Sequence, residues 1–236
     1  MDKKIASAEA AVAEIKDGAT IMVGGFGLSG NPENLLAALK AKGVKGLTIV
    51  ANNAGIDTFG IGTLINNGQV EKMIMSYGGE CAAFEQMALD GRLKVEWNPQ
   101  GTLAERIRAG GAGIGGFFTP TGYGTLVAEG KETRQIDGRW MVFEKPLKAD
   151  FSFIKAWKGD THGNLVYRKT SRNFHQAMAT AGKRVFAEVE QLVEPGTLDG
   201  DHVHTPGIYV DKIFQGPKYQ KPIEKLTVRK REAVGA

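Results

Sequence analysis

Hydrogen-bond donors gather where apolar runs of this sequence end. The glycine-rich stretch 24–30 (GGFGLSG) follows an apolar run at 20–23 and precedes a helical pattern. Asn52 and Asn53 follow a second apolar run, and Gln100 follows a later one. Backbone N–H groups of a glycine loop at a helix N-terminus can bind an anion or a developing oxyanion, and side-chain amides add neutral donors. These residue types suit acyl chemistry, in which a carbonyl oxygen gains and then loses negative charge.

The elements that would position these donors alternate between strand and helix patterns. Strands are predicted over residues 20–23, 47–51, 73–77, 93–97, 151–157 and 184–189, helices over 5–15, 32–42, 84–89 and 102–109, and a hairpin over 151–169. This alternation predicts an α/β fold, a mostly parallel sheet with helices on both faces. Ligands bind beyond the carboxyl ends of such strands. We therefore expect the donors to lie along one edge of the sheet.

Size, charge and cysteine content limit the class of protein. The 236 residues are interpreted as a single domain, 1–236, with a solvated basic tail at about 216–236. The net charge of +4 comes from 30 basic and 26 acidic residues, mixed along the chain without interleaved aromatics, so no nucleic-acid partner is expected. No apolar run reaches the roughly 18 residues of a membrane span, and no signal peptide is recognisable. The lone Cys81 suits a reducing compartment, so we expect a cytoplasmic protein without membrane association.

The glycine stretch also contains the pattern of a dinucleotide-binding loop. Gly25, Gly27 and Gly30 spell G-x-G-x-x-G between a predicted strand and a predicted helix. A Rossmann dehydrogenase would place a carboxylate about 20 residues further on. Asn52 and Asn53 stand there instead, which disfavours a dehydrogenase. The stretch also lacks the second glycine of G-x-S-x-G and the Gly-Lys-Ser/Thr of a phosphate loop.

Two further groups could carry chemistry. His202 and His204 have the spacing at which two strand residues point the same way, and with Asp199 or Asp201 they could hold zinc. No further His or Cys completes that set, so a solvated turn is preferred and no metal is expected. Cys81 begins a predicted helix, where an exposed thiol would have a lowered pKa. A small side chain packed at the helix start is the preferred interpretation.

Taken together, the motifs resemble the A (alpha) half of class I coenzyme A transferases. The resemblance rests on residues 17–32 (DG-x-x-IMVGGF-x-x-x-G-x-P), 52–55, 99–111, 119–125, 155–157, 172–174 and 204–210. These segments cover nearly the whole chain and are specific in combination. The resemblance implies the fold of the alpha half of that family, shared with sugar-phosphate isomerases.

The resemblance also implies a reaction and a partner. Coenzyme A (CoA) would move from an acyl-CoA, expected to be succinyl-CoA, to a 3-oxoacid, expected to be acetoacetate, by a ping-pong mechanism. A glutamate in an E-x-G-x-x-G motif of a separate B (beta) subunit would be the nucleophile. The nearest match here, Glu194-Pro195-Gly196, has Asp199 in place of the last glycine, so the nucleophile is not expected in this chain. An A2B2 assembly and no permanently bound cofactor are implied.

Site residues follow from the same resemblance. Asn52 would form part of the oxyanion hole, with Asn53 as the alternative, and Gln100 would line the substrate pocket. The residues expected to contact CoA are Gly24, Gly25, Phe26, Gly27, Leu28, Ser29 and Gly30. Alternatives are the alpha half of a 3-oxoadipate or acetate/acetoacetate transferase, a non-catalytic anion-binding module and a Rossmann dehydrogenase.

Overall fold

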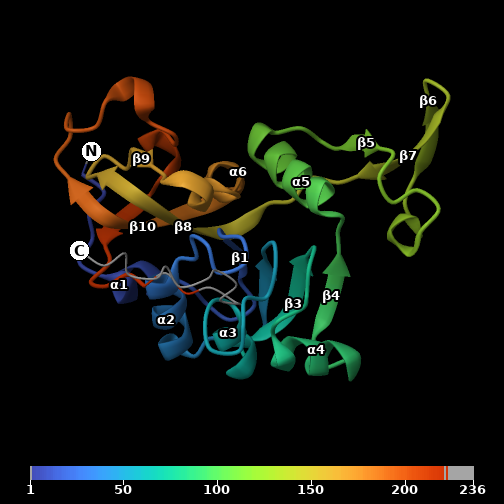
Figure 1. Cartoon of the computed structure of the whole chain (residues 1–236), viewed down its shortest axis with the longest axis horizontal. Helices are drawn as coiled ribbons and strands as arrows, with labels where there is room; N and C mark the ends of the chain where they lie inside the picture. The colour runs from blue at the N-terminus through green and yellow to red at the C-terminus, as the bar shows by residue number, and fades with distance from the viewer. Residues whose placement is uncertain (1, 221, 223–236) are drawn as a thin grey trace, which may run out of the picture.

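The fold is built on one large sheet of parallel strands (Figure 1). The computed structural model describes residues 2–220 and 222. Within them, seven parallel strands form the sheet and a short strand pairs antiparallel with one of them. In sheet order these are β11 (Lys212–Gln215), β10 (Gly182–Val193), β8 (Ala149–Asp160), β1 (Thr20–Val23), β2 (Leu47–Val50), β3 (Val70–Met75) and β4 (Lys94–Trp97), with β9 (Leu165–Val166) beside β8. The predicted α/β fold with a mostly parallel sheet is confirmed.

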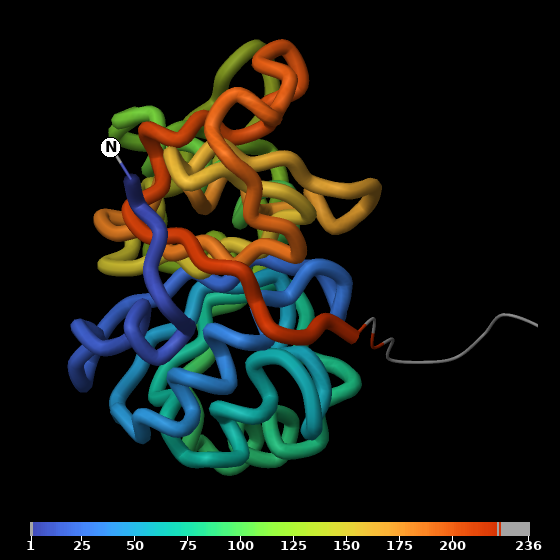
Figure 2. The backbone as a smooth tube through the Cα atoms, turned by 90° about the vertical axis from the view of Figure 1, so that its left-hand side faces the viewer, coloured from blue at the N-terminus to red at the C-terminus, as the bar shows by residue number. Residues whose placement is uncertain are grey.

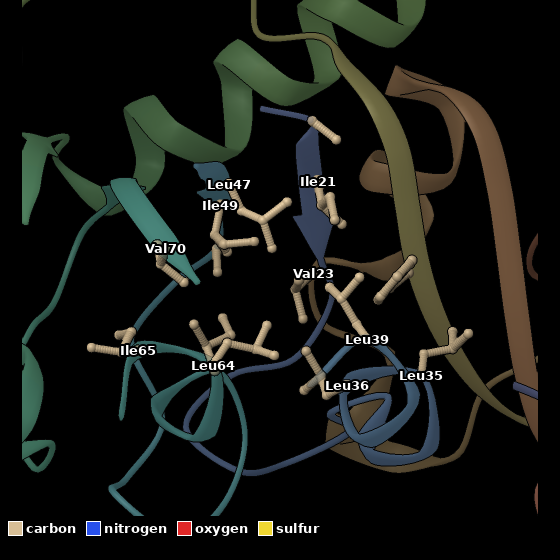
Figure 3. Close-up of a cluster of buried hydrophobic side chains, with 14 of the residues drawn as sticks. Ile21, Val23, Leu35, Leu36, Leu39, Leu47, Ile49, Leu64, Ile65 and Val70 are labelled. Atoms are coloured by element: carbon tan, nitrogen blue, oxygen red, sulfur yellow. The ribbon is translucent and has the colours of Figure 1, made fainter. Parts of the chain in front are cut away.

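Helices cover both faces of this sheet, as predicted (Figure 1). One face carries α1 (Ala8–Val12), α2 (Glu33–Lys42), α3 (Gly62–Asn66) and α4 (Ala82–Leu89), and the other carries α5 (Gln100–Ala112) and α6 (His175–Ala181). Because side chains alternate along a strand, Ile21 and Val23 of β1 pack against the first face while Met22 packs against the second. Figure 3 shows Ile21 and Val23 beside the leucines of α2.

Helix α2 begins just after the glycine-rich stretch and ends at Gly43. Gly43 has a φ of 76°, and its N–H bonds the carbonyls of Leu39 and Lys40, as a left-handed C-cap requires. The expected capping of the other end by Asn31 is wrong, since the N-cap residue is Pro32 and no side chain of the cap residue bonds there. The carboxylate of Glu188, from β10, accepts the N–H of Leu35 at 2.8 Å instead. A distant side chain thus replaces the local cap.

The order of the strands creates a crevice next to β1. From β1 the chain runs outward through β2, β3 and β4, and then returns to β8 on the other side of β1. Ligands bind at such a reversal, outside the carboxyl ends of the strands. The stretch 24–30, called the glycine loop from here on, leaves β1 at this position. The topology therefore places the glycine loop where an α/β sheet usually binds its ligand.

A small antiparallel sheet lies between α5 and β8 in the chain and extends away from the large sheet (Figure 1). Its strands are β5 (Phe117–Thr119), β6 (Thr133–Ile136) and β7 (Arg139–Glu144), in the order β5-β7-β6. The rings of Tyr123 and Trp140 stack on it at 5.5 Å. The sequence patterns did not predict this sheet, and the assignment of residues 1–236 to one domain stays a prediction.

The N-terminal segment lies beside β11, and Figure 2 shows the two running together. Ile5 donates its N–H to the carbonyl of Ile213 at 2.9 Å, so the helix predicted over 5–15 is confined to Ala8–Val12. Of the predicted tail at 216–236, residues 216–220 and 222 are described and the others lie outside the described residues. In the described part of the chain, no helix combines the length and apolar character that crossing a membrane requires.

Candidate functional site

Asn52 and Gln100, predicted to share a site, are in direct contact. Asn52 lies just beyond β2 and is 3% exposed. Its Oδ1 accepts an N–H from Gln100 Nε2 at 3.1 Å and the hydroxyl of Ser76 at 3.2 Å. Gln100 is the first residue of α5, and Ser76 follows β3. The ends of two strands and the start of a helix therefore meet at one amide.

Asn53 continues this contact to the glycine loop. The Nδ2 of Asn52 donates to Asn53 Oδ1 at 3.3 Å, and the N–H of Gly27 donates to the same oxygen at 3.0 Å. Gln100, Asn52, Asn53 and Gly27 thus form one hydrogen-bonded chain, called the amide cluster from here on. Each side-chain amide carries two N–H groups, so both asparagines keep a donor beyond these bonds.

The glycine loop does not present free backbone donors in the way the sequence suggested. Five of its N–H groups bond within the chain: Gly24 to Phe153 O at 3.0 Å, Gly25 to Asn173 Oδ1 at 3.2 Å, Phe26 to Ser29 O at 3.1 Å, Gly27 to Asn53 at 3.0 Å and Ser29 to Phe26 O at 2.9 Å. These five groups are therefore engaged by the protein itself. The expectation that they form an open anion site is wrong for them.

The loop instead forms a wall of a cavity of about 630 Å³. The cavity lies between the loop, the start of α2, the segment 168–171 and the C-terminal residues 218–222. The loop contributes Phe26, Leu28, Ser29 and Gly30 to the lining. Asn52, Asn53 and Gln100 do not line this cavity, and the loop touches their cluster through Gly27. The predicted residues therefore fall into two neighbouring sets joined by the loop.

Basic side chains surround this cavity. Lys155 lines it from β8, pairs with Glu190 of β10, and places its ammonium 5.1 Å from the centre of the Tyr219 ring. Four further basic residues line the cavity, namely Lys40, Arg168, Lys169 and Lys218. Such a lining suits an anionic ligand.

The C-terminal segment forms part of this wall. Tyr219 donates its hydroxyl to the carbonyl of Val189 at 3.0 Å, and burial raises the pKa of that hydroxyl. Lys218, Gln220 and Pro222 also line the cavity. The interpretation of residues 216–236 as a solvated tail is therefore wrong for these described residues.

Two carboxyl groups lie near the start of α2. Glu188 is fully buried, accepts N–H groups from Asn34 at 3.0 Å and Leu35 at 2.8 Å, and burial raises its pKa to about 7. Glu33 lines the cavity and accepts the N–H of Gly60 at 3.1 Å, and burial raises its pKa too. Its Oε1 is buried without a hydrogen-bond partner among the described residues.

Asn173 and His175 contact the glycine loop, which sequence reasoning missed. Asn173 bonds Gly25 and Ser29, and His175 bonds Gly30. Asn173 belongs to one of the motifs on which the family resemblance rests, and His175 follows two residues later. That was the available signal, but it did not show which segment these side chains contact.

The alternatives for Cys81 and for residues 199–204 are also decided by contacts. Cys81 is fully buried at the start of α4, and burial raises the pKa of its thiol to about 11, which agrees with the packed interpretation. His202 Nδ1 lies 2.6 Å from Asp199 Oδ2, whereas His204 Nδ1 accepts the N–H of Tyr167 at 2.9 Å. The two imidazoles thus have separate partners. No group of three or more His, Cys, Asp or Glu side chains suited to a metal ion is found among residues 2–220 and 222.

Comparison with known families matches residues 5–216 to the coenzyme A transferase family model. The chain belongs to the coenzyme A transferase family. The A subunit of the succinyl-CoA:3-ketoacid coenzyme A transferase of Xanthomonas campestris pv. campestris (strain B100) is 56% identical over 96% of this chain and 94% of its own length. The A subunit of the probable succinyl-CoA:3-ketoacid coenzyme A transferase of Bacillus subtilis (strain 168) is 52% identical over 100% of this chain and 99% of its own length.

A longer relative is the mouse mitochondrial succinyl-CoA:3-ketoacid coenzyme A transferase 2A, at 48% identity. This transferase chain covers only 46% of the mouse protein, although 93% of the chain is matched. Among solved structures, an acyl-CoA transferase from E. coli O157:H7 is similar with a TM-score of 0.84 and 24% identity, over 93% of this chain and 48% of that one. Glutaconate coenzyme A-transferase from Acidaminococcus fermentans matches with a TM-score of 0.79 and 19% identity, over 91% of this chain and 76% of that one. These structures support the transferase fold.

Proposed function

We propose that this chain is the alpha half of an enzyme that moves CoA from succinyl-CoA to a 3-oxoacid, with acetoacetate as the expected acceptor. Bacterial relatives of nearly the same length, at 52% and 56% identity, are named as one of the two kinds of chain in such a transferase. The mouse relative is about twice as long as the matched region. Its additional half supports a second, separate B subunit for this chain, in a complex expected to be A2B2. Cys81, a free thiol, suits the expected cytoplasmic location.

The reaction would proceed in two matched halves. A glutamate carboxylate from the B subunit would attack the thioester carbonyl of succinyl-CoA and displace CoA thiolate, which leaves a mixed anhydride. The thiolate then attacks the glutamyl carbonyl, so that succinate departs and a glutamyl-CoA thioester remains. Acetoacetate repeats these steps in reverse order. Acetoacetyl-CoA leaves and the free glutamate returns.

The amide cluster is the observation that carries this proposal. Each carbonyl attack gathers negative charge on oxygen, and neutral amide donors held in place stabilise that charge without reorganising. Gln100 and Ser76 fix the oxygen of Asn52, so its nitrogen must face the other way, toward Asn53. We therefore assign Asn52 to the oxyanion hole, with Asn53 as the alternative and Gln100 as the residue that orients Asn52.

The glycine loop, residues 24–30, would bind CoA itself. It borders the amide cluster through Gly27 and the basic cavity through Phe26, Leu28, Ser29 and Gly30. CoA carries its thioester at one end and its phosphates at the other. A substrate lying along the loop could place the thioester at the amides and its anionic end near the basic residues.

The test is to coexpress this chain with the B subunit encoded for the same complex and to assay CoA transfer. We expect transfer from succinyl-CoA to acetoacetate, and a mass of two copies of each chain by light scattering. A panel with 3-oxoadipate and acetate identifies the preferred acid. Absence of transfer to every acid in the panel, from a folded complex, would overturn the proposed function.

A further inference from the structure

A single imidazole contacts both ends of the glycine loop. The Nε2 of His175 lies 2.9 Å from the carbonyl oxygen of Gly30, and its Nδ1 accepts the backbone N–H of Lys155 at 3.3 Å. An acceptor at Nδ1 leaves Nε2 as the donor of a neutral ring. His175 is fully buried, and burial lowers its pKa to about 3. The ring thus stays a neutral donor to Gly30.

The same ring lies against Gly24 at the other end of the loop. A methyl group added at Gly24 would overlap the His175 imidazole. Glycine at this position therefore lets the ring approach the backbone closely enough to reach Gly30. One side chain thereby sets the separation between the first and the last residue of the loop.

Asn173 makes a second connection across the loop. Its Oδ1 accepts the N–H of Gly25 at 3.2 Å, and its Nδ2 donates to the carbonyl of Ser29 at 3.0 Å. Gly25 and Ser29 are the next residues inward from the two ends that His175 contacts. The two side chains therefore hold successive pairs of loop residues from the same side.

The segment that carries these side chains also lines the cavity. Residues 168–171 face the cavity, and Asn173 and His175 follow within four residues. Tyr167 stacks on the His175 ring at 5.5 Å and shares a hydrogen bond with Thr205 at 2.7 Å, which fixes the ring from behind. The two walls of the cavity are thus tied together by one stretch of chain.

We propose that His175 and Asn173 are positioning residues that hold the glycine loop in the shape that binds acyl-CoA. The inference rests on the proposed function for its substrate, whereas its structural part concerns the loop alone. Neither side chain needs to touch the reacting atoms. Both act through the loop, so their loss affects acyl-CoA binding before it affects the acid.

The experiment compares His175→Phe and His175→Gln in the complex with the B subunit. Phenylalanine keeps a ring against Tyr167 but cannot donate to Gly30, whereas glutamine keeps a donor at the reach of Nε2. We expect His175→Phe to raise KM for acyl-CoA about tenfold with KM for the acid unchanged, and His175→Gln to restore most of the loss. Amide hydrogen exchange over residues 24–30 should become about tenfold faster in His175→Phe.

Ser152→Ala is the matched control for stability. Its hydroxyl is buried and donates to the carbonyl of Met178 at 2.7 Å, so the variant loses a bond between β8 and α6 without touching the loop. We expect a lower melting temperature with unchanged KM and unchanged exchange over 24–30. Equal changes in Ser152→Ala and His175→Phe would reduce His175 to a general stabilising role and overturn the proposal.

Hydrogen exchange separates this proposal from the proposed function, because it requires no activity. Faster exchange of the loop in a complex without transferase activity would uphold the positioning role and reject the reaction. Unchanged exchange in His175→Phe would reject the positioning role in an active complex. If His175→Phe does not fold, Asn173→Asp gives the same decision, since a carboxylate oxygen would face the carbonyl of Ser29 where Nδ2 now donates.

Discussion

Gln100 donates a side-chain N–H to Asn52 Oδ1 at 3.1 Å, which joins the first residue of α5 to the residue beyond β2. The contact orients the Asn52 amide, because the acceptor oxygen is taken by Gln100 and Ser76 and the nitrogen is turned to Asn53. An amide held in this way is preorganised to donate to a developing negative charge. The first two predictions test this relationship.

Asn52→Ala should lower kcat of the complex by about a hundredfold or more, the usual effect of losing an oxyanion-hole donor. The measurement is steady-state transfer from succinyl-CoA, with the fold checked by thermal melting. Asn67→Ala is the matched control, since its exposed amide at the end of α3 bonds only Gln69 in the described structure. Near-normal turnover of a folded Asn52→Ala complex would remove Asn52 from the oxyanion hole.

Asn53→Ala should act differently, because Asn53 Oδ1 accepts the N–H of Gly27 in the glycine loop. We expect a rise of about tenfold in KM for acyl-CoA, with a smaller fall in kcat than in Asn52→Ala. Measuring both constants for both variants decides between the two asparagines. A larger loss of kcat in Asn53→Ala would transfer the oxyanion role to Asn53.

The parts of the fold that the sequence predicted well are those set by local patterns. The strand at 20–23 has the predicted bounds, because a short apolar run precedes a glycine turn, and α2 ends at Gly43 as expected. The spacing of Ile5 and Ile15 fitted a longer helix than the one observed. Ile5 instead bonds Ile213 far along the chain. Distant pairing, which no local pattern reports, replaced the helix there.

The same distinction applies to the candidate site. Asn52 and Gln100 could be expected to approach, since the carboxyl ends of parallel strands share one edge of the sheet. The occupied N–H groups of the glycine loop could not be expected. Their partners include Asn173, whose contact with Gly25 spans 148 positions of the sequence. The small sheet of β5, β6 and β7 was missed because its strands are short and half exposed.

Gly24→Ala should destabilise the chain and disturb the glycine loop. The added methyl group overlaps the buried imidazole of His175, and overpacking of this kind costs roughly 1–3 kcal/mol. Denaturant unfolding measures the loss, and hydrogen exchange over 24–30 locates it. Gly115→Ala is the control, since a methyl group there meets no atom within 4 Å. Equal stability of the two variants would show that the loop and His175 separate without cost.

Glu188 gives the stability a pH dependence of definite sign. Burial raises the pKa of its carboxyl to about 7, so the folded chain keeps this proton up to neutral pH while the unfolded chain loses it near the ordinary value for glutamate. Between those two values unfolding releases a proton, and the stability that the protonated group contributes is lost as pH rises toward 7. The groups with charge influence on this carboxyl are Glu33, which opposes its ionisation, and Lys155, which favours it.

Glu188→Gln removes this titration while leaving acceptor capacity for the N–H of Leu35. Relative to the variant, the wild-type chain should lose on the order of 3 kcal/mol of unfolding free energy between about pH 4.5 and 8, with most of the change below about pH 7. Urea unfolding across this pH range measures the difference, and taking it against the variant cancels the titration of Glu33. A difference that stays constant across this range would mean that Glu188 ionises in the folded chain at the pH of an exposed glutamate. In that case its bonds to Leu35 and Asn34 would stabilise the carboxylate enough to offset the cost of burying its charge.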